Sequence, residues 1–258
     1  SILDTEPTMA QSSSKGSDTT KVALWIGILL IAIAVIGLAF ATAPPVPEQH
    51  ASKIKVPRDM NAVKELAAVL SEYKQKYLFH VSLIYGLVFV FLQSFSVPGT
   101  IFLSFLGGAL YGLIPGIIIV AFLSACGASG AYFLSYLVGR RIIQQCAPGR
   151  LKSFGETVEK NRANLWNYFI FIRISPLLPN WFVNLASPIF SIPFHIFFIG
   201  TFLGVIPQSF IAVKAGLTIQ DIQSVSDVLD WRALGSLFLL AFLALVPTLK
   251  PVQKVLNK

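Results

Sequence analysis

The sequence has little charge, and over one long stretch it has none. No charged residue occurs in residues 78–139, and no carboxylate occurs between Glu72 and Glu156. Only 12% of the 258 residues are charged, while 55% are hydrophobic. A soluble domain of this length carries more charge and less apolar surface. The composition therefore excludes an ordinary soluble protein and indicates an integral membrane protein.

The sequence also lacks the residue patterns of most enzymes and metal proteins. Its two cysteines, Cys126 and Cys146, are too few and too far apart for a disulfide framework. His195 has no Cys, Asp or Glu at the spacing of metal ligands, so we predict no metal site. The chain has no glycine-rich loop ending in Lys-Ser or Lys-Thr and no nucleophilic elbow. We therefore expect no cofactor, no enzymatic activity and no ATP-driven lipid transport.

The net charge of +8 does not indicate nucleic-acid binding. The basic residues flank apolar segments in short groups, such as Lys250, Lys254 and Lys258 near the C-terminus, rather than alternating with aromatic residues in a stripe. Lys and Arg beside a membrane span orient the chain and attract anionic head groups. The distribution therefore predicts phospholipids, and not nucleic acid, as partners.

The apolar segments divide the chain into units. Residues 22–43 carry no charge and, at about 1.5 Å per residue, are long enough to cross a hydrocarbon core of about 30 Å. A signal peptide is the alternative, but the segment starts late and follows no strong basic cluster. We predict a disordered cytosolic tail at residues 1–21, a first transmembrane helix at 22–43, and a linker at 44–77 that contains an amphipathic helix at 60–77. The core follows at residues 78–216. Residues 217–258 then form an acidic link, the last transmembrane helix at 234–249, and a basic cytosolic tail. We interpret the amphipathic helix as a solvated connector at the membrane surface.

Proline and glycine interrupt the apolar segments of the core. Breaks are expected at Pro98 and Gly99, at Pro176 and Pro179, and at Pro207. A break that faces lipid leaves backbone amides and carbonyls without partners, so breaks persist where protein or a water-filled cavity covers them. The breaks therefore mark the predicted working site.

The charged loops predict how the chain crosses the membrane. The loop at residues 139–164 and the C-terminal tail are basic, whereas the link at 217–231 is acidic. Basic loops prefer the cytosol, and this preference is violated if every apolar segment crosses fully. The conflict disappears if residues 78–113 and 165–190 are re-entrant hairpins, which leaves four full crossings and both termini in the cytosol. The predicted fold is all-α and polytopic: an inverted repeat of two re-entrant helical hairpins, each followed by a transmembrane helix, plus flanking transmembrane helices.

Several short motifs in the core resemble one family. They are Pro98-Gly99 with residues 104–108, Tyr136 to Arg140, Phe171 to Pro176, Pro179 to Phe182, Phe197 to Pro207, and Ala212 to Gly216. In combination, over residues 75–250, they are similar to the DedA/VTT (SNARE-associated Golgi protein) superfamily, and most of all to its eukaryotic transmembrane protein 41 branch. The resemblance implies a multi-pass protein of the endoplasmic reticulum membrane. It also implies energy-independent phospholipid scrambling that supports lipid distribution and autophagosome formation.

One departure from the family bears on the mechanism. Bacterial DedA relatives look like proton-coupled transporters that use carboxylates within the membrane, and neither predicted hairpin unit here contains Asp or Glu. Proton coupling requires a group that gains and loses a proton in the low-dielectric interior. The absence of carboxylates favours a passive path for lipid over an ion-driven carrier.

Arg173 is the first candidate for head-group contact. A cation inside an apolar segment costs about 2.5 to 3.5 kcal/mol on insertion scales, so Arg173 is expected to face protein, a cavity or head groups. Its guanidinium could hold a phosphodiester with two parallel hydrogen bonds. Alternatively, it could satisfy the carbonyls that Pro176 and Pro179 leave free, or extend to the cytosolic surface. Both interpretations stay open.

Further candidates are polar residues near the breaks. Asn180, Asn184 and Gln208 would line a wet groove or form hydrogen bonds between helices. Lys214 could reach the lumenal surface and Arg140 could anchor a span, although the family motif also makes Arg140 a candidate contact.

Two other functions remain possible from the sequence. One is an ion-coupled transporter of small solutes with the same fold, which a dependence on a proton or sodium gradient would favour. The other is a membrane scaffold, in which changes in the loop at 139–164 would matter more than changes at Arg173. The sequence does not predict lipid selectivity, protein partners or the oligomeric state.

Overall fold

A computed structural model describes residues 8–45, 56–218 and 231–245. All regular structure in these ranges is helical, which confirms the all-α prediction. Four helical segments are long and apolar enough to cross a membrane: Thr19–Ala41, Met60–Ser94, Leu113–Gly139 and Phe194–Leu217. The chain is therefore a multi-pass membrane protein.

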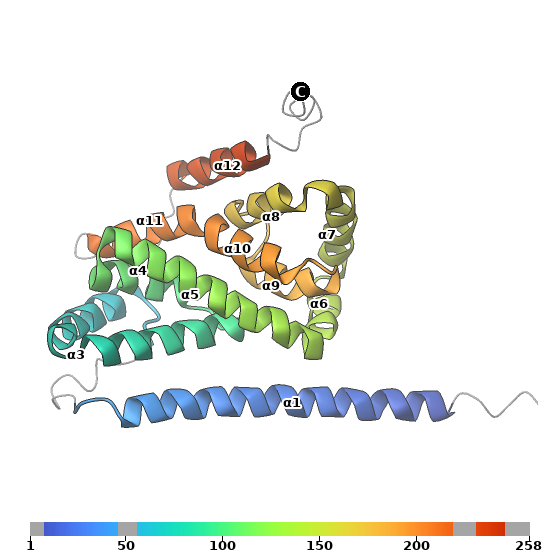
Figure 1. Cartoon of the computed structure of the whole chain (residues 1–258), viewed down its shortest axis with the longest axis horizontal. Helices are drawn as coiled ribbons and strands as arrows, with labels where there is room; N and C mark the ends of the chain where they lie inside the picture. The colour runs from blue at the N-terminus through green and yellow to red at the C-terminus, as the bar shows by residue number, and fades with distance from the viewer. Residues whose placement is uncertain (1–7, 46–55, 219–230, 246–258) are drawn as a thin grey trace, which may run out of the picture.

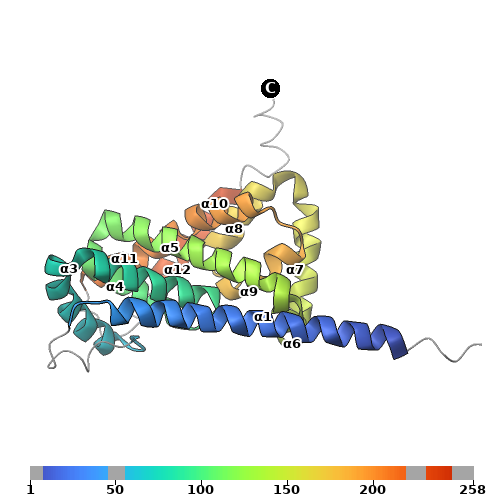
Figure 2. The same cartoon turned by 60° about the horizontal axis from the view of Figure 1, so that its bottom comes forward.

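Helix α1 (Thr8–Ala41) lies along one side of the other helices (Figures 1 and 2). It packs on α3 and on the π-helical turn η1, and no residue of its most apolar stretch is buried. The sequence predicted a disordered tail over residues 1–21, but the helix already begins at Thr8. Extending a helix costs less than starting one, so the apolar span can carry helical structure into the preceding polar residues. Residues 1–7 of the predicted tail lie outside the described residues.

Helix α3 (Met60–Ser94) joins the predicted amphipathic helix to the first hairpin segment. The two parts meet at a kink, where Tyr77 has the non-helical angles φ −130° and ψ 44°. The apolar face of the first part is buried in the core that α4 and α11 also form, with Val63 fully enclosed. The interpretation as a solvated connector is therefore wrong, because this face finds apolar partners within the protein.

The start of α3 gives a first prediction. The Oδ1 atom of Asp59 accepts a hydrogen bond of 2.8 Å from the N–H of Ala62, which satisfies one of the free amides at the helix start. Asp59→Ala should lower the free energy of unfolding by about 1 kcal/mol, whereas Asp59→Asn keeps the acceptor and should unfold like the wild type. Thermal unfolding in detergent measures both variants. Equal melting of the alanine and asparagine variants would contradict this role of the cap.

Helices α3 and α4 (Thr100–Tyr111) form the first hairpin. Its turn contains Pro98 and Gly99, and Gly99 has a φ of 123° that other residues rarely adopt. Helix α5 (Leu113–Leu134) follows, packs against both arms of the hairpin, and continues into η1 (Ser135–Gly139).

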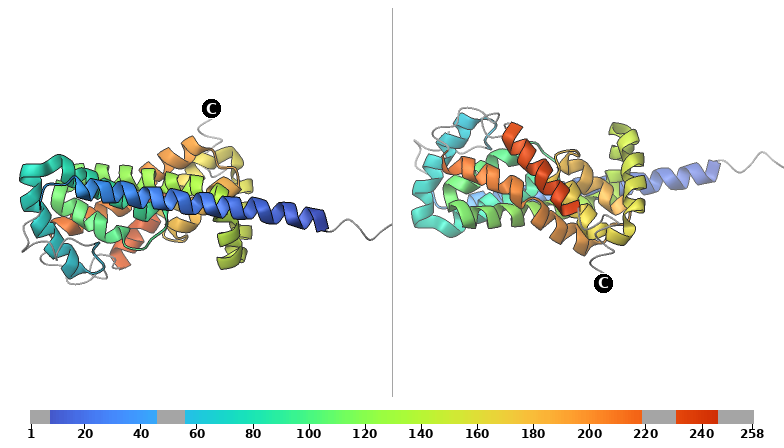
Figure 3. Two further views of the ribbon diagram at one scale, coloured as in Figure 1. Left: turned by 90° about the horizontal axis from the view of Figure 1, so that it is seen from below. Right: turned by 90° about the horizontal axis from the view of Figure 1, so that it is seen from above.

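The second half of the chain consists of shorter helices. They are α6 (Arg140–Cys146), α7 (Pro148–Lys160), η2 (Arg162–Asn164), α8 (Leu165–Ile174), α9 (Asn180–Ile189), α10 (Phe194–Gly204), α11 (Ile206–Leu217) and α12 (Trp231–Leu245). Pro176 and Pro179 lie in the turn between α8 and α9, and Pro207 lies in the first turn of α11. Helix α12 packs on α8 (Figure 3). The predicted last span extends past Leu245, where residues 246–249 lie outside the described residues, as do residues 219–230 of the acidic link.

The two hairpins point in opposite directions along the molecule. The α3–α4 hairpin opens toward the end at which α3 kinks, and the α8–α9 hairpin opens toward the end that α6 and α7 occupy (Figure 1). This is the relation that an inverted repeat requires, with α5 following the first hairpin and α10–α11 following the second. How deeply each hairpin enters a bilayer stays a prediction.

Candidate functional site

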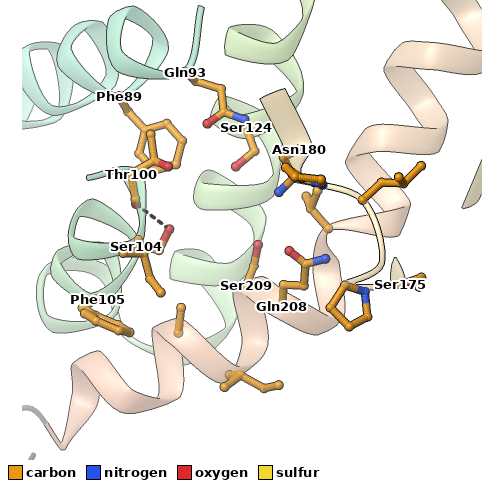
Figure 4. A pocket seen from close by; sticks show the side chains of 17 residues that line it. Phe89, Gln93, Thr100, Ser104, Phe105, Ser124, Ser175, Asn180, Gln208 and Ser209 are labelled. Carbon is orange, nitrogen blue, oxygen red and sulfur yellow. Dashed lines mark hydrogen bonds between the residues drawn. The ribbon is translucent and has the colours of Figure 1, made fainter. Parts of the chain in front are cut away.

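A cavity of about 350 Å³ lies where the turns of the two hairpins meet. We call it the central cavity (Figure 4). Helices α3, α4, α5 and α11 and the start of α9 all contribute to its wall, together with the turn at residues 175–179. Its lining residues are Phe89, Gln93, Thr100, Ile101, Ser104, Phe105, Ser124, Ser175, Pro176, Leu178, Pro179, Asn180, Val205, Gln208, Ser209, Ile211 and Ala212. Of the predicted break residues, Pro176 and Pro179 line this cavity; Pro98, Gly99 and Pro207 do not, although the neighbouring Thr100 and Gln208 do.

The polar groups of the central cavity are hydroxyls and amides. None of the 17 lining residues is Asp, Glu, Lys, Arg or His. The polar members come from both hairpins and from the helices that follow them: Gln93, Thr100, Ser104, Ser124, Ser175, Asn180, Gln208 and Ser209. Such a wall can hydrate a zwitterionic group without offering a fixed charge that would hold it or a group that would exchange a proton with it.

Gln208 connects this wall to the end of α8. Its Nε2 atom donates to the carbonyl of Arg173 at 2.8 Å and lies 3.4 Å from the carbonyl of Ile174. These carbonyls belong to the last turn of α8. They have no backbone N–H one helical turn later to accept from, because the chain leaves the helix before Pro176. The Gln208 side chain thus supplies the missing donor and fixes the edge of the cavity.

Arg173 does not line the central cavity. Its side chain is only 1% exposed, and its guanidinium carbon lies 5.1 Å from the ring centre of Phe169 and 4.9 Å from that of Phe197. Its Nε and Nη2 atoms find no hydrogen-bond acceptor in the described part of the chain. The charge is therefore enclosed between α8 and α10, where cation–π contact with two rings compensates part of its lost hydration.

Comparison with known proteins identifies the family to which these features belong. The VTT domain model matches residues 97–218, from the turn of the first hairpin to the end of α11. Transmembrane protein 41B from Gallus gallus is 42% identical over 91% of this chain and 87% of its own length. The chain belongs to the VTT domain family. Within it, the similarity lies in the transmembrane protein 41 branch, as the sequence motifs predicted.

Further relatives support the same assignment. Transmembrane protein 41B from Homo sapiens is 40% identical over 91% of this chain and 80% of that protein. The transmembrane protein 41 homolog of Dictyostelium discoideum is 44% identical over 83% of this chain, which spans 64% of that relative's length. No solved structure matches the chain.

In the folded VTT domain, some of the candidate residues line the central cavity and others lie away from it. Asn180 and Gln208 line the central cavity. Asn184 is buried away from it, and its Oδ1 atom has no partner among the described residues. Lys214 is exposed on α11, with its Nζ atom 5.9 Å from the ring centre of Phe210. The side chain of Arg140 lies outside the described residues.

Sequence reasoning missed most of the polar wall of this VTT domain. Gln93, Thr100, Ser104, Ser124 and Ser209 all line the central cavity, but none was a candidate. A signal was present in part, because Ser104 and Ser124 are isolated polar residues in apolar segments, and Gln93 and Thr100 lie on either side of the first break. Hydroxyls are common in membrane helices, where they bond to their own backbone. Only the spatial convergence of four helices distinguishes these five residues from other polar ones.

Proposed function

We propose that the chain is an energy-independent phospholipid scramblase of the endoplasmic reticulum membrane. The observation that supports this most directly is a central cavity with polar but uncharged walls, placed where two opposed helical hairpins turn. A phospholipid head group crosses a bare bilayer slowly because it must lose its hydration. Hydroxyl and amide groups at the hairpin turns lower that cost, while the acyl chains remain in the surrounding lipid.

The proposal includes a passive and weakly selective mechanism. No residue that lines the central cavity carries a charge, so the cavity provides no group that couples movement to a proton. A head group needs only transient hydration to pass, and tight binding would slow its release. From the family resemblance we also propose that the protein supports lipid distribution and autophagosome formation, and from the charges of its loops that both termini lie in the cytosol. We further propose that the protein is not an enzyme.

Dithionite quenching of labelled phospholipid in liposomes tests this function. The purified protein should allow quenching well beyond the outer-leaflet half of the label, without nucleotide and without an ion gradient. Quenching that stops at half would reject scrambling. Transport that appears only with a proton or sodium gradient would favour the ion-coupled carrier instead.

We further propose that Arg173 contacts the phosphate of a passing head group. Its two unpaired nitrogen atoms provide donors for a phosphate, and its backbone carbonyl already holds Gln208 at the edge of the central cavity. Because the guanidinium is enclosed between Phe169 and Phe197, this contact requires α8 and α10 to separate during transport. The arrangement described here is then the resting state.

Arg173→Met tests the role of this charge without opening a large void. Replacing a buried, poorly paired ion with an apolar side chain of similar length should leave the thermal stability unchanged or higher. If the charge contacts phosphate, scrambling should fall about tenfold or more, as expected for the loss of a hydrogen bond to a charged group. A variant that is stable and scrambles at the wild-type rate would show that Arg173 has no part in transport.

A further inference from the structure

A second cavity, of about 390 Å³, lies between α7, α8 and the turn that follows α8. We call it the α7–α8 cavity. It is lined by Gly149, Arg150, Ser153, Phe154, Thr157, Tyr168, Phe171, Ile172, Ser175, Leu177 and Leu178. Apolar side chains from α8 and the turn form most of its wall, and polar side chains from α7 form one edge. The cavity therefore has an amphipathic lining.

The polar edge contains one cation. Arg150, Ser153 and Thr157 follow the helical spacing of three and seven residues, so they share one face of α7. The Thr157 hydroxyl donates to the Ser153 carbonyl at 2.8 Å. Arg150 is exposed and forms no ion pair within residues 8–45, 56–218 and 231–245. Its five N–H donors are thus available to an anion at the mouth of the cavity.

The α7–α8 cavity adjoins the central cavity. Ser175 and Leu178 line both spaces, so the turn between α8 and α9 forms the partition between them. Leu177, in the same turn, is 63% exposed and lines only the α7–α8 cavity. Helix α7 belongs to the basic loop at residues 139–164, and it lies with α6 at one end of the molecule (Figure 1). A molecule bound at Arg150 is therefore separated from the central cavity by the turn between α8 and α9.

We propose that the α7–α8 cavity binds a phospholipid and is the entrance from the basic face to the central cavity. The guanidinium of Arg150 takes the phosphate, and the acyl chain lies against Phe171, Ile172 and Leu177. Arginine suits this position because its planar guanidinium binds two phosphate oxygens at once. The apolar wall favours a phospholipid over inorganic phosphate, because inorganic phosphate has no acyl chain to pack against it. The binding site stands on the lining of this cavity alone, whereas its role as an entrance rests on the proposed scrambling function.

The chain offers a matched control on the same helix. Lys152 is also an exposed cation of α7, but it lies on another face and does not line the cavity. Arg150→Gln and Lys152→Gln remove the same charge from the same basic loop. A general effect of surface charge on anionic lipid would appear equally in both variants, whereas a binding site affects only the first.

The test uses the full chain in liposomes with a phosphatidylcholine that carries a photoreactive group on its acyl chain. Labelling of the peptide that contains residues 171–178 should occur in the wild type and in Lys152→Gln, and should drop about tenfold in Arg150→Gln, as for the loss of a hydrogen bond to a charged group. Arg150→Lys should recover part of it, since a point charge lacks the bidentate geometry. Millimolar inorganic phosphate should not compete, because the site also binds the acyl chain.

Dithionite quenching on the same liposomes separates the two proposals. Slower scrambling in Arg150→Gln than in Lys152→Gln supports the entrance. If the wild type does not scramble but residues 171–178 are labelled in an Arg150-dependent way, the scramblase proposal fails and the binding site stands. If the wild type scrambles while Arg150→Gln and Lys152→Gln label and scramble alike, the inference is overturned. Full competition by inorganic phosphate would also overturn it, because the site would then be one for free phosphate.

Discussion

Gly216→Ala should prevent stable assembly of the core. A Cβ atom at Gly216 would overlap the backbone carbonyl oxygen of Phe105, and one at Gly108 would overlap the backbone carbonyl oxygen of Val213. Helices α4 and α11 therefore approach backbone to backbone at two points. A backbone carbonyl cannot rotate aside like a long side chain, so a single methyl group must push the helices apart. Overpacking of this kind costs about 1 to 3 kcal/mol or more.

The measurement is the thermal unfolding of detergent-purified protein, followed by size-exclusion chromatography. Gly216→Ala and Gly108→Ala should each lower the melting temperature strongly or yield aggregated protein. Gly37→Ala is the matched control, because nothing lies within 4 Å of a Cβ at Gly37. Alanine there should be neutral or stabilise α1 by up to about 1 kcal/mol. If the Gly216 variant melts like the Gly37 variant, the close approach of α4 and α11 does not exist in the membrane protein.

The spacing of the glycines predicts some of the close helix contacts and not others. A repeat of Gly108, Gly112 and Gly116 predicts close helix packing, and Gly108 does meet the backbone of α11. Gly112 serves a different purpose, since it has a φ of 80° and separates α4 from α5. Gly216 was visible only as part of a family motif. Local spacing indicates that a backbone can be approached, but it does not identify the helix that approaches it.

The same limit applies to the candidate site. Proline and glycine act on their own neighbours, so the turns after α3 and α8 fall beside Pro98 and Gly99 and beside Pro176 and Pro179. The kink at Tyr77 has no proline or glycine beside it, and it lies where the charged part of α3 gives way to the apolar part. Phe169 lies four residues before Arg173 on α8, so local spacing allows this contact, but the contact with Phe197 depends on α8 and α10 meeting, which no local pattern states. The central cavity likewise exists only through contacts between residues that are far apart in the chain. These features are properties of the packed molecule, which sequence periodicity alone does not encode.

Filling the central cavity should abolish scrambling while the protein stays folded. Ser104 and Ser124 line the cavity from α4 and α5, two different walls (Figure 4). A tryptophan at Ser104 or a phenylalanine at Ser124 would place an aromatic ring in a space of about 350 Å³ and remove the polar surface that hydrates a head group. Both variants should scramble at the rate of protein-free liposomes, measured by dithionite quenching beside thermal unfolding.

Two controls separate blockage from other effects. Ser104→Ala removes a hydroxyl that already donates to the Thr100 carbonyl of its own helix at 3.0 Å, so scrambling should change less than about threefold. Ile199→Trp adds a large ring on α10 at a position that is 44% exposed and should leave the rate unchanged. Because Ser104→Trp and Ser124→Phe lie on different helices, a folding defect in one variant does not affect the test of the other. Wild-type scrambling by either folded variant would show that lipids do not pass through this cavity and would place the path on the outer surface of the hairpins.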